Sequence, residues 1–184
     1  GTIAIEAALI AHNIAPGLFR KEFAFQKWQD YDESLYNKVK SEQENQININ
    51  EKVEIFGYDS EFANIVMALY SIKLLNLEKY ITFKKQTMEK FEPKHKGATL
   101  IINPPYGERI GEDDSINELY EMIGDIFKNK CIDFNCFVFT ANLDAAKNIG
   151  LKTSQKIVLK NGNLDSRLLS FPIQKGTYNK KGSI

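Results

Sequence analysis

The chain has 184 residues, of which 43% are hydrophobic and 26% charged, and its formal net charge is zero. This length suits one α/β domain with a core that needs no disulfide. The composition excludes a disordered chain, and no apolar run is long enough to cross a membrane. Zero net charge argues against a domain that holds nucleic acid by electrostatics alone, because such domains are usually basic.

The amino-terminal third predicts helices and then a loop. Residues 3–11 are mostly apolar helix formers, and Pro16-Gly17 provides a stop, so we expect a buried helix. The chain runs from Gly1-Thr2 directly into this helix, and we therefore expect it to be a fragment. Residues 20–52 are polar with scattered aromatics, which predicts a helix packed by those aromatics, followed by a solvated loop over residues 41–50.

The middle of the chain alternates strands and helices. Residues 53–58 are β-rich, and apolar residues at helical spacing follow after Asp59-Ser60, which could cap the helix. Residues 80–83 predict another short strand. Residues 98–102 form a continuous apolar run that ends on Asn103-Pro104-Pro105, as a fully buried parallel strand would.

The remainder completes the fold. Ser115 to Glu118 forms a capping box, which predicts the start of an amphipathic helix. A strand over 134–139 and a short helix over 143–148 follow, and two β-rich runs are then joined by Asn161-Gly162, which is typical of a type I′ hairpin turn. We expect an α/β fold with a doubly wound, mostly parallel sheet and an antiparallel C-terminal hairpin.

Two cysteines, Cys131 and Cys136, have neither a metal-ligand spacing nor the pattern of a secreted disulfide framework. His12 and His95 lie far from them in the sequence. We therefore expect reduced, buried thiols in a cytoplasmic protein and no metal site.

Polar residues just after strands are candidates for ligand binding, because ligands of open parallel sheets bind beyond the carboxyl ends of the strands. Asp59 follows one strand, where its carboxylate could accept hydrogen bonds from ribose hydroxyls; a helix N-cap is the alternative. Gly1-Thr2 precedes a helix, and the helix N-terminus could bind a nucleotide or amino-acid moiety.

The strongest candidate is the turn that begins at Asn103. Pro104 and Pro105 fix φ and remove two backbone donors, which leaves a stiff turn lined by acceptors. The Asn103 side-chain carbonyl and the Pro104 backbone carbonyl could accept both hydrogens of an exocyclic amine, and Tyr106 could stack on the base. The alternative is an ordinary proline-rich strand exit. Arg109, next to Glu108, could contact phosphate or form an ion pair within the loop.

These motifs, in this order, resemble the bacterial large-subunit ribosomal RNA guanine-N2 methyltransferases that carry a THUMP domain. The resemblance spans essentially the whole chain and is carried by the following segments: Gly1 to Leu9, Asn13 to Leu18, Phe23 to Phe25 with Trp28, Gly57 to Asp59, Asn103 to Arg109, and Asn161-Gly162. The turn alone is shared with adenine-amino DNA methyltransferases and glutamine methyltransferases, which remain alternatives, as does a non-catalytic RNA-binding remnant.

The resemblance implies a class I methyltransferase fold, S-adenosylmethionine as cofactor, and methyl transfer to a guanine amino group in ribosomal RNA or a precursor ribosomal particle. It also implies a THUMP domain upstream, so that residues 1–184 are a catalytic domain truncated at its N-terminus. No metal is implied. The residues that it assigns to cofactor binding are Gly1, Thr2, Tyr58, Asp59, Thr87 and Met88. It assigns catalysis to Asn103, Pro104 and Tyr106, and substrate binding to Pro105, Gly107 and Arg109.

Two departures from the family pattern concern the cofactor. Thr87 stands where the family usually has an Asp that contacts the adenine amine. The family's first strand and its Asp-Pro-x-Cys-Gly-Ser segment precede the position of Gly1, so the chain would lack the central strand of its sheet. We therefore expect weak or absent cofactor binding by this chain alone.

Overall fold

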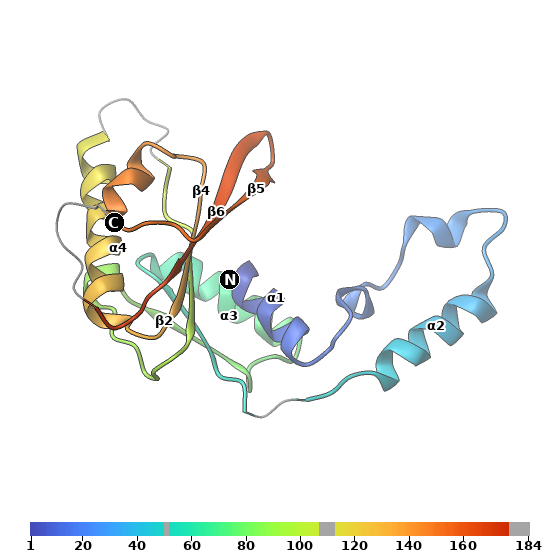
Figure 1. The fold of residues 1–184 in the computed structure, drawn as a ribbon. Coiled ribbons are helices and arrows are strands. Elements are labelled where there is room, and N and C mark those ends of the chain that lie inside the picture. Colours follow the sequence, from blue (N-terminus) through green and yellow to red (C-terminus); the bar gives the residue numbers. More distant parts are fainter. Residues whose placement is uncertain (50–51, 107–112, 177–184) are drawn as a thin grey trace. The chain divides into compact units, whose positions relative to one another are not determined.

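In the computed structural model, the described residues are 1–49, 52–106 and 113–176. The chain divides into two compact units, residues 1–87 and 88–184. Each unit has its own sheet: β1 and β2 pair in the first, and β3, β4, β6 and β5 lie in that order in the second (Figure 1). The additional strand that the resemblance places ahead of Gly1 stays a prediction.

The first unit is a two-stranded parallel sheet with helices packed on it. Its elements are α1 (Thr2–Ala11), the 3-10 helices η1 (Pro16–Phe19) and η2 (Ala24–Lys27), α2 (Glu33–Asn45), β1 (Ile55–Asp59), α3 (Phe62–Leu74) and β2 (Ile81–Lys85). Ile55 lies opposite Ile81, and Asp59 lies opposite Lys85. The carboxyl ends of the two strands therefore meet at one edge.

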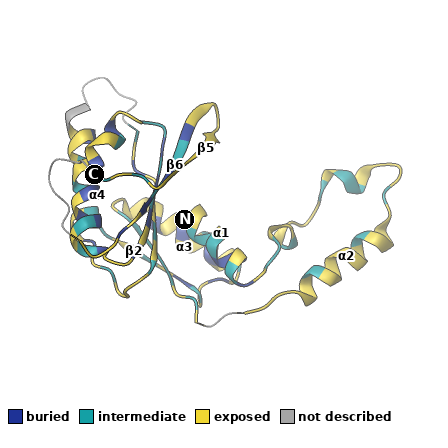
Figure 2. Cartoon of the chain, viewed as in Figure 1, coloured by how far each residue is buried: buried dark blue, intermediate teal, exposed yellow. Residues whose placement is uncertain are grey.

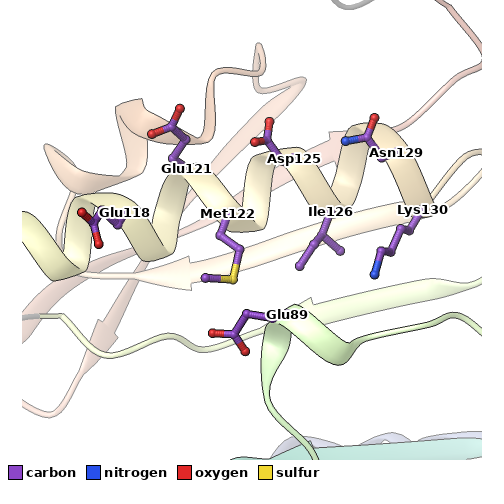
Figure 3. A pocket seen from close by; sticks show the side chains of 8 residues that line it. All are labelled: Glu89, Glu118, Glu121, Met122, Asp125, Ile126, Asn129 and Lys130. Carbon is purple, nitrogen blue, oxygen red and sulfur yellow. The ribbon is translucent and has the colours of Figure 1, made fainter.

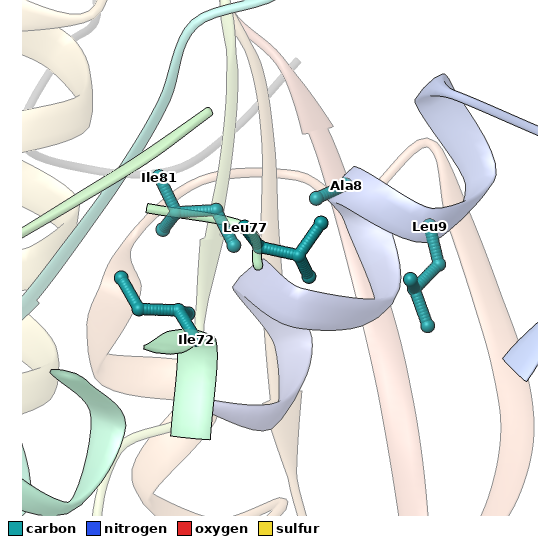
Figure 4. Close-up of a cluster of buried hydrophobic side chains, with 5 residues drawn as sticks. All are labelled: Ala8, Leu9, Ile72, Leu77 and Ile81. Atoms are coloured by element: carbon teal, nitrogen blue, oxygen red, sulfur yellow. The ribbon is translucent and has the colours of Figure 1, made fainter. Parts of the chain in front are cut away.

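The core of this unit is a small apolar cluster contributed by α1, α3 and the start of β2. Its buried members are Ala8, Leu9, Ile72, Leu77 and Ile81 (Figure 4). Burying a side chain of the size of Leu or Ile stabilises a fold by about 1.5–3 kcal/mol. The prediction of a buried first helix was wrong for much of its surface, because Ala8 and Leu9 are buried whereas Ile10 is 80% exposed.

The predicted loop over residues 41–50 was wrong for its first half, because α2 continues to Asn45, whereas residues 46–49 lie outside the helix. Residues 41–45 include Glu42, Gln43 and Glu44, which are good helix formers. The Asp32 carboxylate caps the helix at its other end by accepting from the Leu35 N–H at 2.9 Å. No residue of α2 is buried, and Figure 2 shows the helix mostly exposed. The predicted aromatic packing is present as a cluster of rings with centroids 5.2–6.4 Å apart, formed by Phe23, Phe25, Trp28, Tyr31 and Tyr36.

The second unit is a four-stranded mixed sheet. Its elements are η3 (Met88–Lys90), β3 (Thr99–Ile102), α4 (Asp113–Lys130), β4 (Asn135–Thr140), η4 (Ala145–Ile149), β5 (Gln155–Asn161) and β6 (Leu164–Pro172). β3 runs parallel to β4, whereas β6 is antiparallel to both β4 and β5. The parallel series followed by an antiparallel hairpin confirms the predicted order of elements.

Three local predictions in this unit were wrong in detail. β3 is half exposed and not fully buried, because among the described strands it pairs only with β4. α4 begins at Asp113, so Ser115 lies inside its first turn and not at its cap. The hairpin turn consists of residues 162 and 163, and only Gly162 has a positive φ, of 59°, whereas a type I′ turn needs positive φ at both positions.

The core of the second unit lies between α4 and the sheet. Tyr120, Phe127, Val138 and Phe171 are fully buried there. Cys131 and Cys136 are free and buried, which confirms the prediction of reduced, buried thiols. Within the described parts of the chain, no helix has the length and apolar character needed to span a membrane, and no group of three or more His, Cys, Asp or Glu could hold a metal ion.

Candidate active site

The turn after β3 carries the predicted substrate chemistry. Asn103 is exposed at the carboxyl end of the strand, Pro104 is buried, Pro105 is exposed and Tyr106 is half-buried. The Tyr106 hydroxyl donates a hydrogen bond to the Asn103 side-chain oxygen at 2.8 Å. The turn therefore folds back on itself, and the tyrosine fixes the orientation of the asparagine amide.

Asn142, just beyond the end of β4, ties this turn to the next segment. Its Nδ2 donates to the Tyr106 backbone carbonyl at 2.8 Å, and its Oδ1 accepts from the Ala145 N–H, at the start of η4, at 2.9 Å. The β5–β6 hairpin also reaches the turn, because Asn161 Nδ2 lies 3.4 Å from the Tyr106 hydroxyl.

A buried polar pair lies behind Asn142. The hydroxyls of Tyr120 and Thr140 share a hydrogen bond of 2.6 Å, and both residues are fully buried. Thr140 Oγ1 also accepts from the Asn142 N–H at 3.0 Å. Burial raises the pKa of the Tyr120 hydroxyl, against the opposing effect of its hydrogen bond to Thr140, and the Tyr106 hydroxyl raises it further. Tyr120 therefore stays neutral and available as a hydrogen-bond partner.

The Asn103 carbonyl keeps capacity for a substrate. A carbonyl oxygen has two lone pairs, and the Tyr106 hydroxyl occupies one of them, so Oδ1 can accept one further hydrogen bond. Because Asn103 is exposed, that position can be reached by an amine. The stacking of Tyr106 on a base stays a prediction.

In the first unit, Asp59 lies where β1 ends. Its Oδ1 accepts from the Glu61 N–H at 2.8 Å, and Asn64 Nδ2 donates to both carboxylate oxygens at 3.2 and 3.1 Å. The N-cap of α3 is Glu61, so the alternative that Asp59 is the N-cap itself was wrong, although its side chain does order the entry to the helix. A carboxylate accepts about four hydrogen bonds, so capacity for a ribose hydroxyl remains.

Thr87 lies near Asp59 along the same edge. The Gln86 N–H donates to the Asp59 carbonyl at 2.9 Å, and Thr87, the next residue, is exposed. Tyr58 is half-buried beside Asp59, and this partial burial raises the pKa of its hydroxyl. The structure therefore places Tyr58, Asp59 and Thr87 along one edge of this sheet, and their role in cofactor binding stays a prediction.

Gly1 begins α1 at a point of close packing, with Thr2 exposed as the first residue of the helix. A Cβ added to Gly1 would lie 2.8 Å from the Ala68 Cβ and 3.2 Å from the Phe83 ring. The first N–H groups of an α-helix have no partner within the helix, and no side chain caps α1. These donors suit an anionic or acceptor group.

The predicted residues fall in different units. Gly1, Thr2, Tyr58, Asp59 and Thr87 belong to the first unit, whereas half-buried Met88 starts η3 in the second, which also holds the turn from Asn103 to Tyr106. Gly107 and Arg109 lie outside the described residues.

A separate open cleft of about 410 Å³ lies between α4 and η3 (Figure 3). Four of its lining residues are acidic, and none of its lining residues is a predicted site residue. The lining consists of Glu89, Glu118, Glu121, Met122, Asp125, Ile126, Asn129 and Lys130.

Sequence reasoning missed Asn142, Thr140 and Tyr120. Thr140 directly follows the predicted strand over residues 134–139, and Asn142 lies two residues further on. Applied to every strand, the criterion that singled out Asp59 and Asn103 would have found Thr140 and pointed to Asn142 beside it. Nothing local marks Tyr120, because its contact with Thr140 joins residues 20 apart in sequence.

Two solved structures with the same fold are described as a putative methyltransferase and a possible methylase. The crystal structure of SMU.472, complexed with SAH, is 33% identical and has a TM-score of 0.87, with 96% of this chain and 46% of that chain covered. A methylase structure from Clostridium difficile 630 is also 33% identical with a TM-score of 0.87, covering 97% of this chain and 47% of its own. The chain therefore has the class I methyltransferase fold.

The chain belongs to the UPF0020 family, described as RMKL-like, methyltransferase domain, which it matches over residues 1–170. It is 33% identical to the slr0064 protein of Synechocystis sp., which is named for RNA methyltransferase activity, over 94% of this chain and 45% of that protein. It is 32% identical to the ribosomal RNA large subunit methyltransferase K/L of Allochromatium vinosum, over 95% of this chain and 24% of that protein. The chain thus spans less than half the length of these curated relatives.

Proposed function

We propose that this chain is the catalytic part of an S-adenosylmethionine-dependent RNA methyltransferase that modifies the exocyclic N2 amine of a guanine in large-subunit ribosomal RNA. The proposed substrate is the RNA itself or a precursor ribosomal particle in the cytoplasm, gripped in part by an upstream THUMP domain. The observation that carries the proposal is the turn from Asn103 to Tyr106, which presents an oriented amide carbonyl at the end of a strand.

The residues of the first unit fit the cofactor by their chemistry. Asp59 offers a half-buried carboxylate for the ribose hydroxyls, and the exposed Thr87 hydroxyl beside it can bond the adenine. The uncapped N-terminus of α1 at Gly1 and Thr2 offers N–H donors. S-adenosylmethionine supplies a methyl group on a positively charged sulfur. A solved relative at 33% identity is complexed with its product SAH, which supports S-adenosylmethionine as the methyl donor.

Asn103 would prepare the amine for transfer. Its Oδ1 and the Pro104 carbonyl would each accept one amine hydrogen, which draws the nitrogen lone pair out of conjugation with the base. That lone pair would form the new N–C bond with the methyl group that a bound S-adenosylmethionine would supply, and the electrons of the broken C–S bond would stay on sulfur. The amine then loses its extra proton to solvent, so no carboxylate base or metal is required.

The names of relatives support RNA as the substrate, and one observation favours a second candidate. Several relatives of 30–33% identity are named ribosomal RNA large subunit methyltransferase K/L. However, a structure from Listeria monocytogenes, 28% identical with a TM-score of 0.81 and covering 93% of this chain and 43% of that chain, is described as a predicted N6-adenine-specific DNA methylase. Adenine in DNA is therefore the second candidate substrate.

Mass spectrometry of nucleosides from a deletion strain separates the two candidates. We expect the large-subunit ribosomal RNA of the deletion strain to lack one N2-methylguanosine, and the full-length gene to restore it. Loss of N6-methyladenine from DNA, with all ribosomal methylguanosines retained, would instead establish the second candidate.

The role of the turn is tested by Asn103→Ala in the full-length protein. Removing one preorganised polar group that acts at the reacting atom typically lowers kcat by about 10²–10³-fold. Because Asn103 is exposed, the thermal unfolding temperature should stay close to that of the wild type. Unaltered methyl transfer by Asn103→Ala would refute the proposed chemistry.

A further inference from the structure

We propose that Asn142 is a positioning residue for methyl transfer. It fixes the far end of the turn from Asn103 to Tyr106 relative to the sheet of the second unit. This proposal rests on the proposed function, because it assigns Asn142 a role in the same reaction. Asn142 does not act on the substrate amine in this scheme. It acts through Tyr106, whose hydroxyl orients the Asn103 carbonyl.

Three hydrogen bonds hold Asn142, two through its side-chain amide and one through its backbone N–H. Nδ2 donates to the Tyr106 carbonyl at 2.8 Å, Oδ1 accepts from the Ala145 N–H at 2.9 Å, and the backbone N–H donates to Thr140 Oγ1 at 3.0 Å. An asparagine whose amide is held at both ends is a fixed connector between the turn and η4.

The connector rests on a rigid support. Thr140 is fully buried at the end of β4, and Tyr120 of α4 is fully buried against it, with a hydrogen bond of 2.6 Å between their hydroxyls. Interiors are packed at the density of organic crystals, and breaking a buried pair leaves a polar group unsatisfied, so this pair strongly resists displacement. The position of Asn142 is therefore set by the core of the second unit.

The far end of the turn needs such an anchor. Pro104 and Pro105 fix φ at the start of the turn, whereas Tyr106, at its far end, has no proline ring to restrict its backbone. Without the bond to Asn142, the Tyr106 backbone would lose its tie to the sheet, and with it the 2.8 Å contact between its hydroxyl and Asn103 Oδ1. A displacement of about 1 Å at a reacting group can cost about 10²-fold in rate.

The substitution Asn142→Asp separates the two ends of the side chain. An aspartate still accepts from the Ala145 N–H, but when ionised it has no donor for the Tyr106 carbonyl. In the full-length protein we expect kcat for RNA methylation to fall by about 10–100-fold, with KM for RNA and the Kd for S-adenosylhomocysteine within about twofold of wild type.

Asn148→Asp is the matched control. Asn148 lies on η4, six residues after Asn142, and its Nδ2 donates at 2.7 Å to Asn117, which is not part of the turn. This control should keep the wild-type kcat. A second pair of variants tests the support: Thr140→Val removes the hydroxyl and should lower kcat with KM unchanged, whereas Thr140→Ser retains it and should restore kcat.

The outcomes distinguish this proposal from the proposed function. If Asn103→Ala loses activity while Asn142→Asp keeps the wild-type kcat, the positioning role is wrong and the function stands. A fall in kcat that is equal for Asn142→Asp and Asn148→Asp also overturns the role, because it would be a general effect of the added charge. If the wild-type protein transfers no methyl group to RNA, both proposals fail. If Asn142→Asp does not fold, the comparison of Thr140→Val with Thr140→Ser decides the question: equal kcat values refute the role.

Discussion

Among the described glycines of the second unit, Gly124 of α4 has the least room for an added methyl group. A Cβ at Gly124 would lie 1.9 Å from the Ile149 carbonyl oxygen, 2.7 Å from its carbonyl carbon and 3.0 Å from its Cα. These are backbone atoms of η4, and Ile149 is fully buried, so no rotamer change can relieve the overlap. In Gly124→Ala, α4 and η4 must move apart.

Two opposing terms set the magnitude. Alanine is a better helix former than glycine by about 1 kcal/mol, which favours the variant. Overpacking costs about 1–3 kcal/mol, and the upper end applies because the overlap is with backbone. We expect a net loss of about 2 kcal/mol in the free energy of unfolding, which corresponds to a fall of about 4–8 °C in Tm for a chain of this size.

Urea unfolding followed by circular dichroism measures this loss, together with the melting temperature. Gly176→Ala is the control, because a Cβ there meets nothing within 4 Å, and its stability should stay within about 0.5 kcal/mol of wild type. Because η4 begins at Ala145, which is bonded to Asn142, methyl transfer should also fall in Gly124→Ala. A Gly124→Ala protein as stable as the wild type would refute the described contact between α4 and η4.

Two further predictions concern other contacts. Gly57→Ala places a Cβ 2.3 Å from the Phe83 ring, so it should lower the free energy of unfolding by about 1–3 kcal/mol in urea. Adding Phe83→Leu to the same chain should recover part of that loss, because the obstacle is a side chain. Equal losses in the single and double variants would contradict this prediction. Lys130 Nζ donates to the Phe91 carbonyl at 2.9 Å and to the exposed Glu92 carboxylate at 2.7 Å. In the same assay, Lys130→Met should lower the free energy of unfolding by about 1 kcal/mol, and Glu92→Gln by less than about 0.5 kcal/mol. A larger loss in Glu92→Gln would show that the ion pair contributes more than the bond to the carbonyl.

The strands and their order could be predicted from sequence because their signals are local. The apolar runs before Asn103 and Thr140 and the Asn161-Gly162 pair each mark an element within a few residues of themselves. The predictions were wrong where the neighbours of a segment in the fold, or its helix cap, outweigh the local sequence pattern. The apolar run over residues 98–102 predicts a buried strand, but that strand has only one described neighbour. The polar run over residues 41–50 predicts a loop, although helix formers and the Asp32 cap extend α2 to Asn45.

The candidate site divides in the same way. Asn103 and Asp59 could be found because both follow strands and their side chains suit a known chemistry. The contact of Asn142 with Tyr106 joins residues 36 apart, and that of Asn161 with Tyr106 joins residues 55 apart. Such pairings depend on the order β3-β4-β6-β5 within the sheet, which no local pattern encodes.

This arrangement explains why the turn alone does not define a substrate. The amide of Asn103 and the carbonyl of Pro104 suit any flat amine, so they are compatible with guanine, adenine or a glutamine side chain. What surrounds them comes from other segments: Asn142 from the end of β4, and Asn161 from the hairpin between β5 and β6. Asn161 reaches only the tyrosine hydroxyl, at 3.4 Å, and so stands next to the region where a base would lie. The hairpin, more than the turn, is therefore where a preference for one base over another can be built.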